Sequence, residues 1–135
     1  MEWSADFELG SESIDRAHRD LSREVANLAQ AINSHAPVAV VNECLADLFQ
    51  AWLEHCRIEQ AEMERHGYPA IAEHATEHLE LTKLLAEVIF EFGVAGKSER
   101  VTGLPEYLRR WFTSHLDGID RALADFIAGT SAEAS

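Results

Sequence analysis

The stretch between His55 and His78 constrains the fold of this chain more strongly than any other segment. It contains two pairs of polar residues four positions apart, His55 with Glu59 and His74 with His78. On an α-helix this spacing puts both members of a pair on one face, one turn apart. Gly67-Tyr68-Pro69 lies between the pairs, and because Gly suits a helix end and Pro a helix start, the chain is expected to reverse there. Two antiparallel helices would then point imidazole-rich faces at each other, as bundles do when they build a metal site.

The length and charge of the chain limit the classes of protein to consider. At 135 residues, the chain is expected to be a single domain over 1–135 that needs no disulfide or structural zinc. The formal net charge of −13 argues against nucleic acid or an anionic membrane surface as a partner. No apolar run approaches the roughly 18 residues of a membrane span, and the acidic opening MEWSADFELG does not resemble a signal peptide.

The two cysteines indicate a reducing compartment. Cys44 and Cys56 lie on one expected helix, ~18 Å apart along its axis, so they cannot bond to each other. Two free thiols fit a cytoplasmic location. Cys56 follows His55 by one helical step, so we expect a small core residue pointing off the metal-facing stripe; a redox role is the weaker alternative.

Apolar residues recur at helical spacing in four segments, and no segment alternates as a strand does. The expected helices cover about 11–34, 38–65, 70–92 and 104–128, after an extended arm over 1–10 and before a frayed tail over 129–135. The last helix is expected to begin at Leu104 or Pro105, with Ile119 on its apolar side. Short connections favour an all-α fold, an up-down-up-down antiparallel four-helix bundle.

Polar residues interrupt the apolar stripes at one level of this bundle, ~9–16 Å from the same end at 1.5 Å per residue. A single core histidine is ordinarily just hydrogen-bonded. Burying five histidines and two carboxylates in one layer without a ligand would be very costly, so a metal site is favoured. His35 and His66 fall in or beside connectors and are expected at the surface. The expected layer consists of His18, His55, Glu59, His74, His78, His115 and Asp120.

Five imidazoles and two carboxylates exceed the four ligands of one zinc ion. They suit two metals bridged by the carboxylates and by one oxo or hydroxo group. With three histidines at one metal and two at the other, the second metal keeps an open position for a small ligand. The nitrogen-rich shell suits iron, with other metals as alternatives. A ferritin-like site requires Glu-x-x-His pairs and a zincin requires His-Glu-x-x-His, and neither pattern occurs.

Taken together, these motifs resemble those of the hemerythrin family, specifically its bacterial domains, over roughly residues 3–127. Each motif is weak alone, whereas all of them in this order are highly specific. In chain order they are Ile14-Asp15-x-x-His18, His55-x-x-x-Glu59, Met63, Gly67-Tyr68-Pro69, His74-x-x-x-His78 and Trp111-x-x-x-His115-x-x-x-x-Asp120.

The resemblance implies two iron ions per chain with an oxo or hydroxo bridge. By resemblance, the six-coordinate iron is held by His74, His78 and His115, the five-coordinate iron by His18 and His55, and both are bridged by Glu59 and Asp120. The assignment of Asp120 as a metal ligand rests on the resemblance alone. Five residues is a rotation of about 140° from His115 on an α-helix, so periodicity would have selected Ile119.

Four positions depart from the family pattern. Ala17, Cys56 and Gln60 replace the usual Gln, Phe and Glu, and none of them is an expected ligand. Phe112 replaces a leucine that lines the oxygen pocket in the family. Its ring either packs in the core or narrows access to the open iron.

The function implied by the resemblance is reversible dioxygen binding for transport, storage or delivery, without turnover, so the protein is not expected to be an enzyme. Nitric oxide is an alternative ligand. The main rival is an oxygen- or redox-sensing domain, cut from or docking onto a signalling protein. A peroxidase or an iron oxidase is the weaker third reading.

Overall fold

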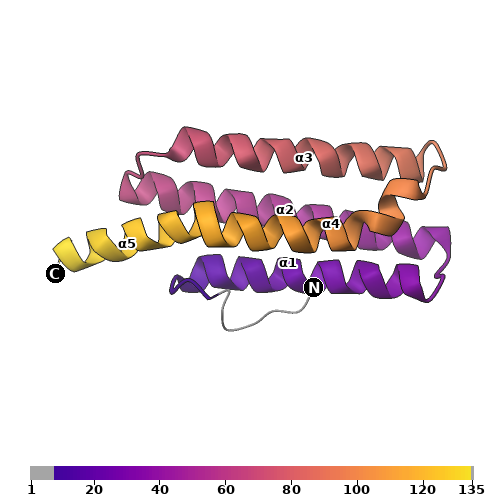
Figure 1. Cartoon of the computed structure of the whole chain (residues 1–135), viewed down its shortest axis with the longest axis horizontal. Helices are drawn as coiled ribbons and strands as arrows, with labels where there is room; N and C mark the ends of the chain where they lie inside the picture. The colour runs from indigo at the N-terminus through magenta and orange to yellow at the C-terminus, as the bar shows by residue number, and fades with distance from the viewer. Residues whose placement is uncertain (1–7, 135) are drawn as a thin grey trace.

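The computed structural model describes residues 8–134 and shows an all-α bundle (Figure 1). Three rods are single helices, α1 (Glu12–Asn33), α2 (Val38–His66) and α3 (Ile71–Gly93). The fourth rod is formed by α4 (Glu99–His115), a π-helical turn η2 (Leu116–Asp120) and α5 (Arg121–Ala134). Successive rods run in opposite directions, and the described residues contain no strand. The expected fold class is therefore confirmed. Most of the expected arm, residues 1–7, lies outside the described residues.

The first three helices end within one residue of their expected bounds, but the fourth rod differs at both ends. It begins at Glu99, so Pro105 lies inside α4 and not in its first turn. Val101 and Leu104 are each 3% exposed, and burying these side chains stabilises the turn before the proline. At the other end, α5 continues to Ala134 through part of the expected tail. Ala and Glu favour a helix, and one glycine costs only about 1 kcal/mol.

The apolar core falls into two clusters on either side of one polar layer. The larger cluster contains buried residues from all four rods, among them Val25, Leu45, Leu85 and Leu108. The smaller cluster consists of Ile14, Met63 and Leu123. The histidines and carboxylates of the expected metal site lie between these two groups along the helices. This division leaves the polar layer surrounded by apolar side chains.

Local features fix how α2 and α3 meet beside the polar layer. Gly67 ends α2 in the left-handed conformation, with φ of 63°, and the chain then reverses into α3. Further along the pair, Trp52 is fully buried and its indole Nε1 donates to the Thr82 hydroxyl at 2.8 Å. Thr82 in turn donates to the backbone carbonyl of His78 at 2.8 Å. The tryptophan therefore links α2 to the turn of α3 that carries a histidine of the layer.

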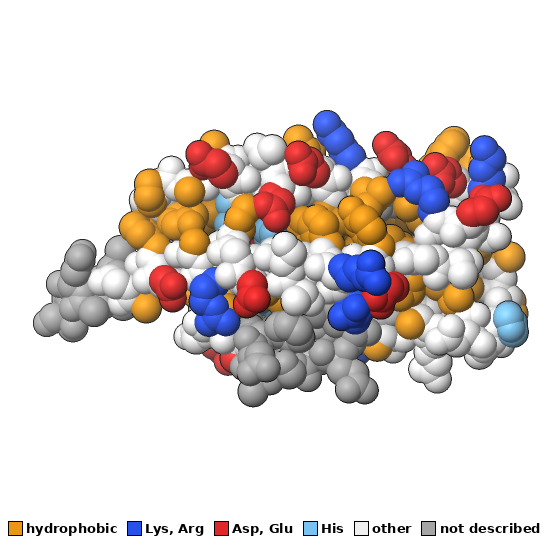
Figure 2. Space-filling model, viewed as in Figure 1, with side chains coloured by type: hydrophobic (Ala, Val, Ile, Leu, Met, Phe, Trp, Pro, Cys, Tyr) orange, Lys and Arg blue, Asp and Glu red, His pale blue; other side chains and the backbone are white. Residues whose placement is uncertain are grey.

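The outer surface is polar, with apolar side chains gathered between rods. Figure 2 shows acidic and basic side chains on the outward faces and apolar ones along the seam between α3 and the fourth rod. Within residues 8–134, no helix combines the length and the apolar content needed to cross a membrane.

Candidate metal centre

All four rods contribute to the polar layer, and the structure brings the seven expected residues together. Each is at most 6% exposed. α1 carries one histidine, α2 a histidine and a glutamate, α3 two histidines, and the fourth rod a histidine and an aspartate. In that order they are His18, His55, Glu59, His74, His78, His115 and Asp120.

The first part of the layer is built by α1 and α2. The Nε2 atoms of His18 and His55 lie 3.0 Å apart. Oε2 of Glu59 lies 2.7 Å from Nε2 of His55 and 3.6 Å from Nε2 of His18. Oδ2 of Asp120 lies 3.2 Å from the same His18 atom. Two imidazoles and one oxygen of each carboxylate therefore converge on one point.

The second part is built by α3 and the fourth rod, around the other two carboxylate oxygens. Oε1 of Glu59 lies 3.0 Å from Nε2 of His74 and 3.4 Å from Nε2 of His78. Oδ1 of Asp120 lies 3.1 Å from Nε2 of His74 and 2.9 Å from Nε2 of His115. Each carboxylate thus turns one oxygen to a two-histidine group, His18 and His55. It turns the other oxygen to a three-histidine group, His74, His78 and His115.

The chemistry of these atoms fits cations. His78 Nε2, His115 Nε2 and both Asp120 oxygens are buried and lack a hydrogen bond of normal geometry within the described part of the chain. Lone pairs that converge in a buried layer repel each other, and a cation between them removes that cost. The ligand atoms of each group lie within 4.8 Å of one another. Imidazole nitrogen with carboxylate oxygen is a donor set of transition metals.

The π-helical turn explains how Asp120 reaches the layer. An α-helix would rotate Asp120 about 140° from His115. The η2 turn, Leu116–Asp120, contains one residue more than an α-helical turn. Residues five apart across it therefore lie on the same face, as residues four apart do in an α-helix. Asp120 is 1% exposed, whereas Ile119 is only half-buried. The expectation that Ile119 lies on the core side is therefore wrong, since α-helical spacing does not hold across this turn.

The carboxylates determine the charge of the histidines in the metal-free layer. Burial alone would lower the pKa of His18, but hydrogen bonds and charge from Asp120 and Glu59 outweigh it and raise the pKa to about 9. The same balance raises the pKa of His74 to about 9. Burial dominates at His55 and lowers its pKa to about 4. Burial would raise the pKa of Glu59, but His55 and the neighbouring histidines hold it well below its usual range.

Two side chains support His115 from outside the layer: Glu77, which the sequence analysis did not single out, and Trp111, which it named only as part of a motif. Nδ1 of His115 lies 2.7 Å from Oε1 of Glu77, which fixes the ring with Nε2 facing the layer. The Trp111 ring stacks on the same imidazole, with centroids 4.5 Å apart and 17° between planes. The position of Glu77 directly before His78 is its only mark in the sequence, and this does not reveal which histidine it reaches.

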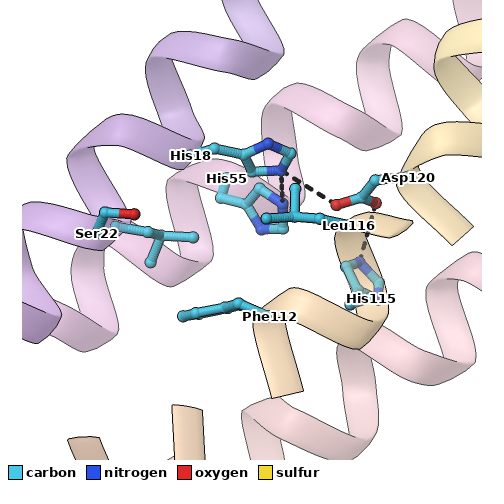
Figure 3. A pocket seen from close by; sticks show the side chains of 8 residues that line it. His18, Ser22, His55, Phe112, His115, Leu116 and Asp120 are labelled. Atoms are coloured by element: carbon cyan, nitrogen blue, oxygen red, sulfur yellow. Dashed lines mark hydrogen bonds and ion pairs between the residues drawn. The ribbon is translucent and has the colours of Figure 1, made fainter. Parts of the chain in front are cut away.

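A small cavity lies against the two-histidine group (Figure 3). Its volume is about 10 Å³, close to the space that one water molecule needs. Phe112, expected near the open metal position, is 5% exposed and lines this cavity. The other lining residues are His18, Leu21, Ser22, His55, His115, Leu116 and Asp120.

The remaining histidines and Cys56 lie outside the seven-residue group. His35 is exposed, as expected, whereas His66 is half-buried and its Nε2 lies 3.4 Å from Glu62. Cys56 is half-buried, and its sulfur lies within 4.8 Å of ring nitrogens of His55 and His78. It is thus nearer the two imidazoles than its place on the helix predicts. Burial raises the pKa of this thiol to about 12, which keeps it protonated.

Comparisons with known proteins agree with this geometry. The model of the family described as "Hemerythrin HHE cation binding domain" matches residues 9–127. A bacteriohemerythrin of Stenotrophomonas maltophilia (strain R551-3) is 31% identical over 123 residues, which cover 91% of this chain and 78% of that protein. A bacteriohemerythrin of Methylococcus capsulatus (strain ATCC 33009 / NCIMB 11132 / Bath) is 30% identical over 67 residues, half of each chain. No solved structure shows a significant match.

Proposed function

Because the chain belongs to the hemerythrin HHE cation-binding family, we propose that it binds dioxygen reversibly at a non-haem di-iron centre. The observation that carries this proposal is the arrangement of the two carboxylates. Each turns one oxygen to the two-histidine group and the other to the three-histidine group. This arrangement supports a pair of metal ions in preference to a single ion.

Each residue of the layer has a distinct part in the proposal. His74, His78 and His115 would hold one iron, and His18 and His55 the other. Glu59 and Asp120 would bridge the two ions, with an oxo or hydroxo group completing the bridge. The group with fewer histidines lies beside the cavity, which suits it to receive the small ligand.

The surroundings of the cavity favour binding over turnover. Two ferrous ions would supply the electrons that dioxygen takes up and returns. Leu21, Phe112 and Leu116 provide apolar walls that limit the entry of water. The carboxylate and imidazoles that line the cavity belong to the proposed ligand set, so none is free to act as an acid or base. We therefore expect a dioxygen-binding protein, not an enzyme.

The test is an optical and metal titration of the purified protein. We expect two irons per chain and charge-transfer bands that appear when the reduced protein meets dioxygen and fade under vacuum. Two irons with prompt, irreversible oxidation would instead favour a redox sensor or an oxidase. Steady turnover with hydrogen peroxide would favour a peroxidase, and binding of nitric oxide alone would change the ligand. A protein that takes up no iron would refute the proposal. A cytoplasmic location and a signalling partner remain predictions.

A further inference from the structure

One hydroxyl group lies in the wall of the cavity beside the two-histidine group. Ser22 follows His18 by four residues on α1, about 6 Å along the helix axis. It is 3% exposed and lines the cavity together with the apolar side chains of Leu21, Phe112 and Leu116. Figure 3 shows its oxygen directed toward the cavity, on the side opposite Asp120.

The Ser22 hydroxyl is not committed to the backbone. A helical serine or threonine commonly donates to the carbonyl four residues earlier. Thr76, Thr82, Thr102 and Thr113 all do so, at 2.8 to 3.0 Å. Within residues 8–129 the Ser22 hydroxyl makes no such bond and no other side-chain hydrogen bond. This hydroxyl lines the cavity and is therefore available to donate to a ligand held there.

We infer that Ser22 donates a hydrogen bond to the small ligand held in this cavity and thereby selects ligands whose outer atom accepts one. The inference rests on the proposed function in placing that ligand beside His18 and His55. The inference adds Ser22 as a residue that binds the ligand, and it adds a preference among ligands. Ligands that carry negative charge on their outer atom are held more tightly than apolar ones of the same size, because hydrogen bonds to charged acceptors are the stronger class.

Azide serves as the probe because it is a small anion with an accepting outer atom and needs no reversible dioxygen chemistry. Its affinity would be measured by optical titration of the oxidised, iron-loaded protein. Ser22→Ala removes the hydroxyl, and we expect azide to bind about ten-fold more weakly. Ser22→Thr and Ser22→Val introduce side chains of nearly the same shape, of which only the first has a hydroxyl. A roughly ten-fold weaker azide affinity of the second variant would therefore isolate the contribution of the hydroxyl. Ser114→Ala, an exposed serine beside His115, is the matched control.

A second measurement on the metal-free protein separates ligand binding from a structural role. If the hydroxyl has no protein partner, Ser22→Ala leaves the midpoint of thermal unfolding unchanged to within about 2 °C. A clear fall in that midpoint would show that Ser22 holds the helix, and would overturn the inference.

The two proposals fail in different ways. Equal azide affinities for Ser22→Thr and Ser22→Val would overturn the role of Ser22, even if dioxygen binds reversibly. A ten-fold difference in a protein that oxidises irreversibly would support Ser22 and refute reversible dioxygen binding. A wild-type protein that takes up no metal would overturn both.

Discussion

Glu77 holds His115 from the side opposite the metal layer, with its Oε1 atom 2.7 Å from Nδ1 of the ring. Glu77 lies on α3 and His115 ends α4, so the pair also ties two rods together. A carboxylate in this place fixes the ring orientation and makes the other nitrogen a better donor. Glu77 would therefore act on a bound metal through His115, as a positioning residue.

Glu77→Ala should weaken metal binding about 10- to 100-fold, because His115 loses its orienting partner. The measurement is a competition titration with a chelator, using iron(II) or cobalt(II). Glu80→Ala removes an exposed carboxylate three residues further along α3 and serves as the control. Equal metal affinities for the two variants would contradict the positioning role.

Asp120→Asn should lower the metal content from two ions per chain, because an amide has one accepting oxygen and no charge to bridge two cations. Asp117 lies in the same π-helical turn but is exposed, so Asp117→Asn should retain the full content. Metal analysis after gel filtration measures both. Two tightly held ions in the Asp120 variant would remove this residue from the proposed bridge.

Phe112→Leu should enlarge the cavity beside the two-histidine group and speed both azide association and oxidation in air, since water and ligands enter more easily. We expect a loss of stability of about 1 kcal/mol, because the exchange removes part of a buried ring and leaves a larger cavity. Phe126→Leu makes the same change at a half-buried ring that packs on Tyr68, away from the cavity. Unchanged rates in the Phe112 variant would leave its ring with a packing role only.

The metal-free protein should be most stable near pH 6.5. In the folded chain the pKa values of His18 and His74 are raised from 6.5 to about 9, so their contribution is complete below pH 6.5 and is lost as the pH rises toward 9. In the folded chain the pKa of His55 is lowered to about 4. Stability therefore falls again from pH 6.5 toward 4, because His55 binds a proton in the unfolded chain and not in the folded chain.

Urea unfolding at a series of pH values, in the presence of a chelator, measures this profile. A stability that rises steadily from pH 6.5 to 9 would contradict the paired state of His18 and His74.

The sequence predicted the fold class and the polar layer because both depend on spacing within single helices. His55 with Glu59 and His74 with His78 follow directly from 3.6 residues per turn. The inward position of Asp120 could not be predicted in this way, because it depends on a departure from that spacing. Glu77 and Ser22 were not found either, since each meets its target across space or across a cavity, and one sequence does not show which rods face each other.

The π-helical turn also divides the fourth rod into two registers. Before it, the buried positions are Val101, Leu104, Leu108, Phe112 and His115. Within it they are Leu116 and Asp120, and after it they are Leu123 and Ala124. Heptad numbering carried straight through from α4 would assign α5 the wrong inward positions. A redesigned core or a chimera joined at this point must therefore keep the extra residue, or rotate the whole of α5 by about 100° against its neighbours.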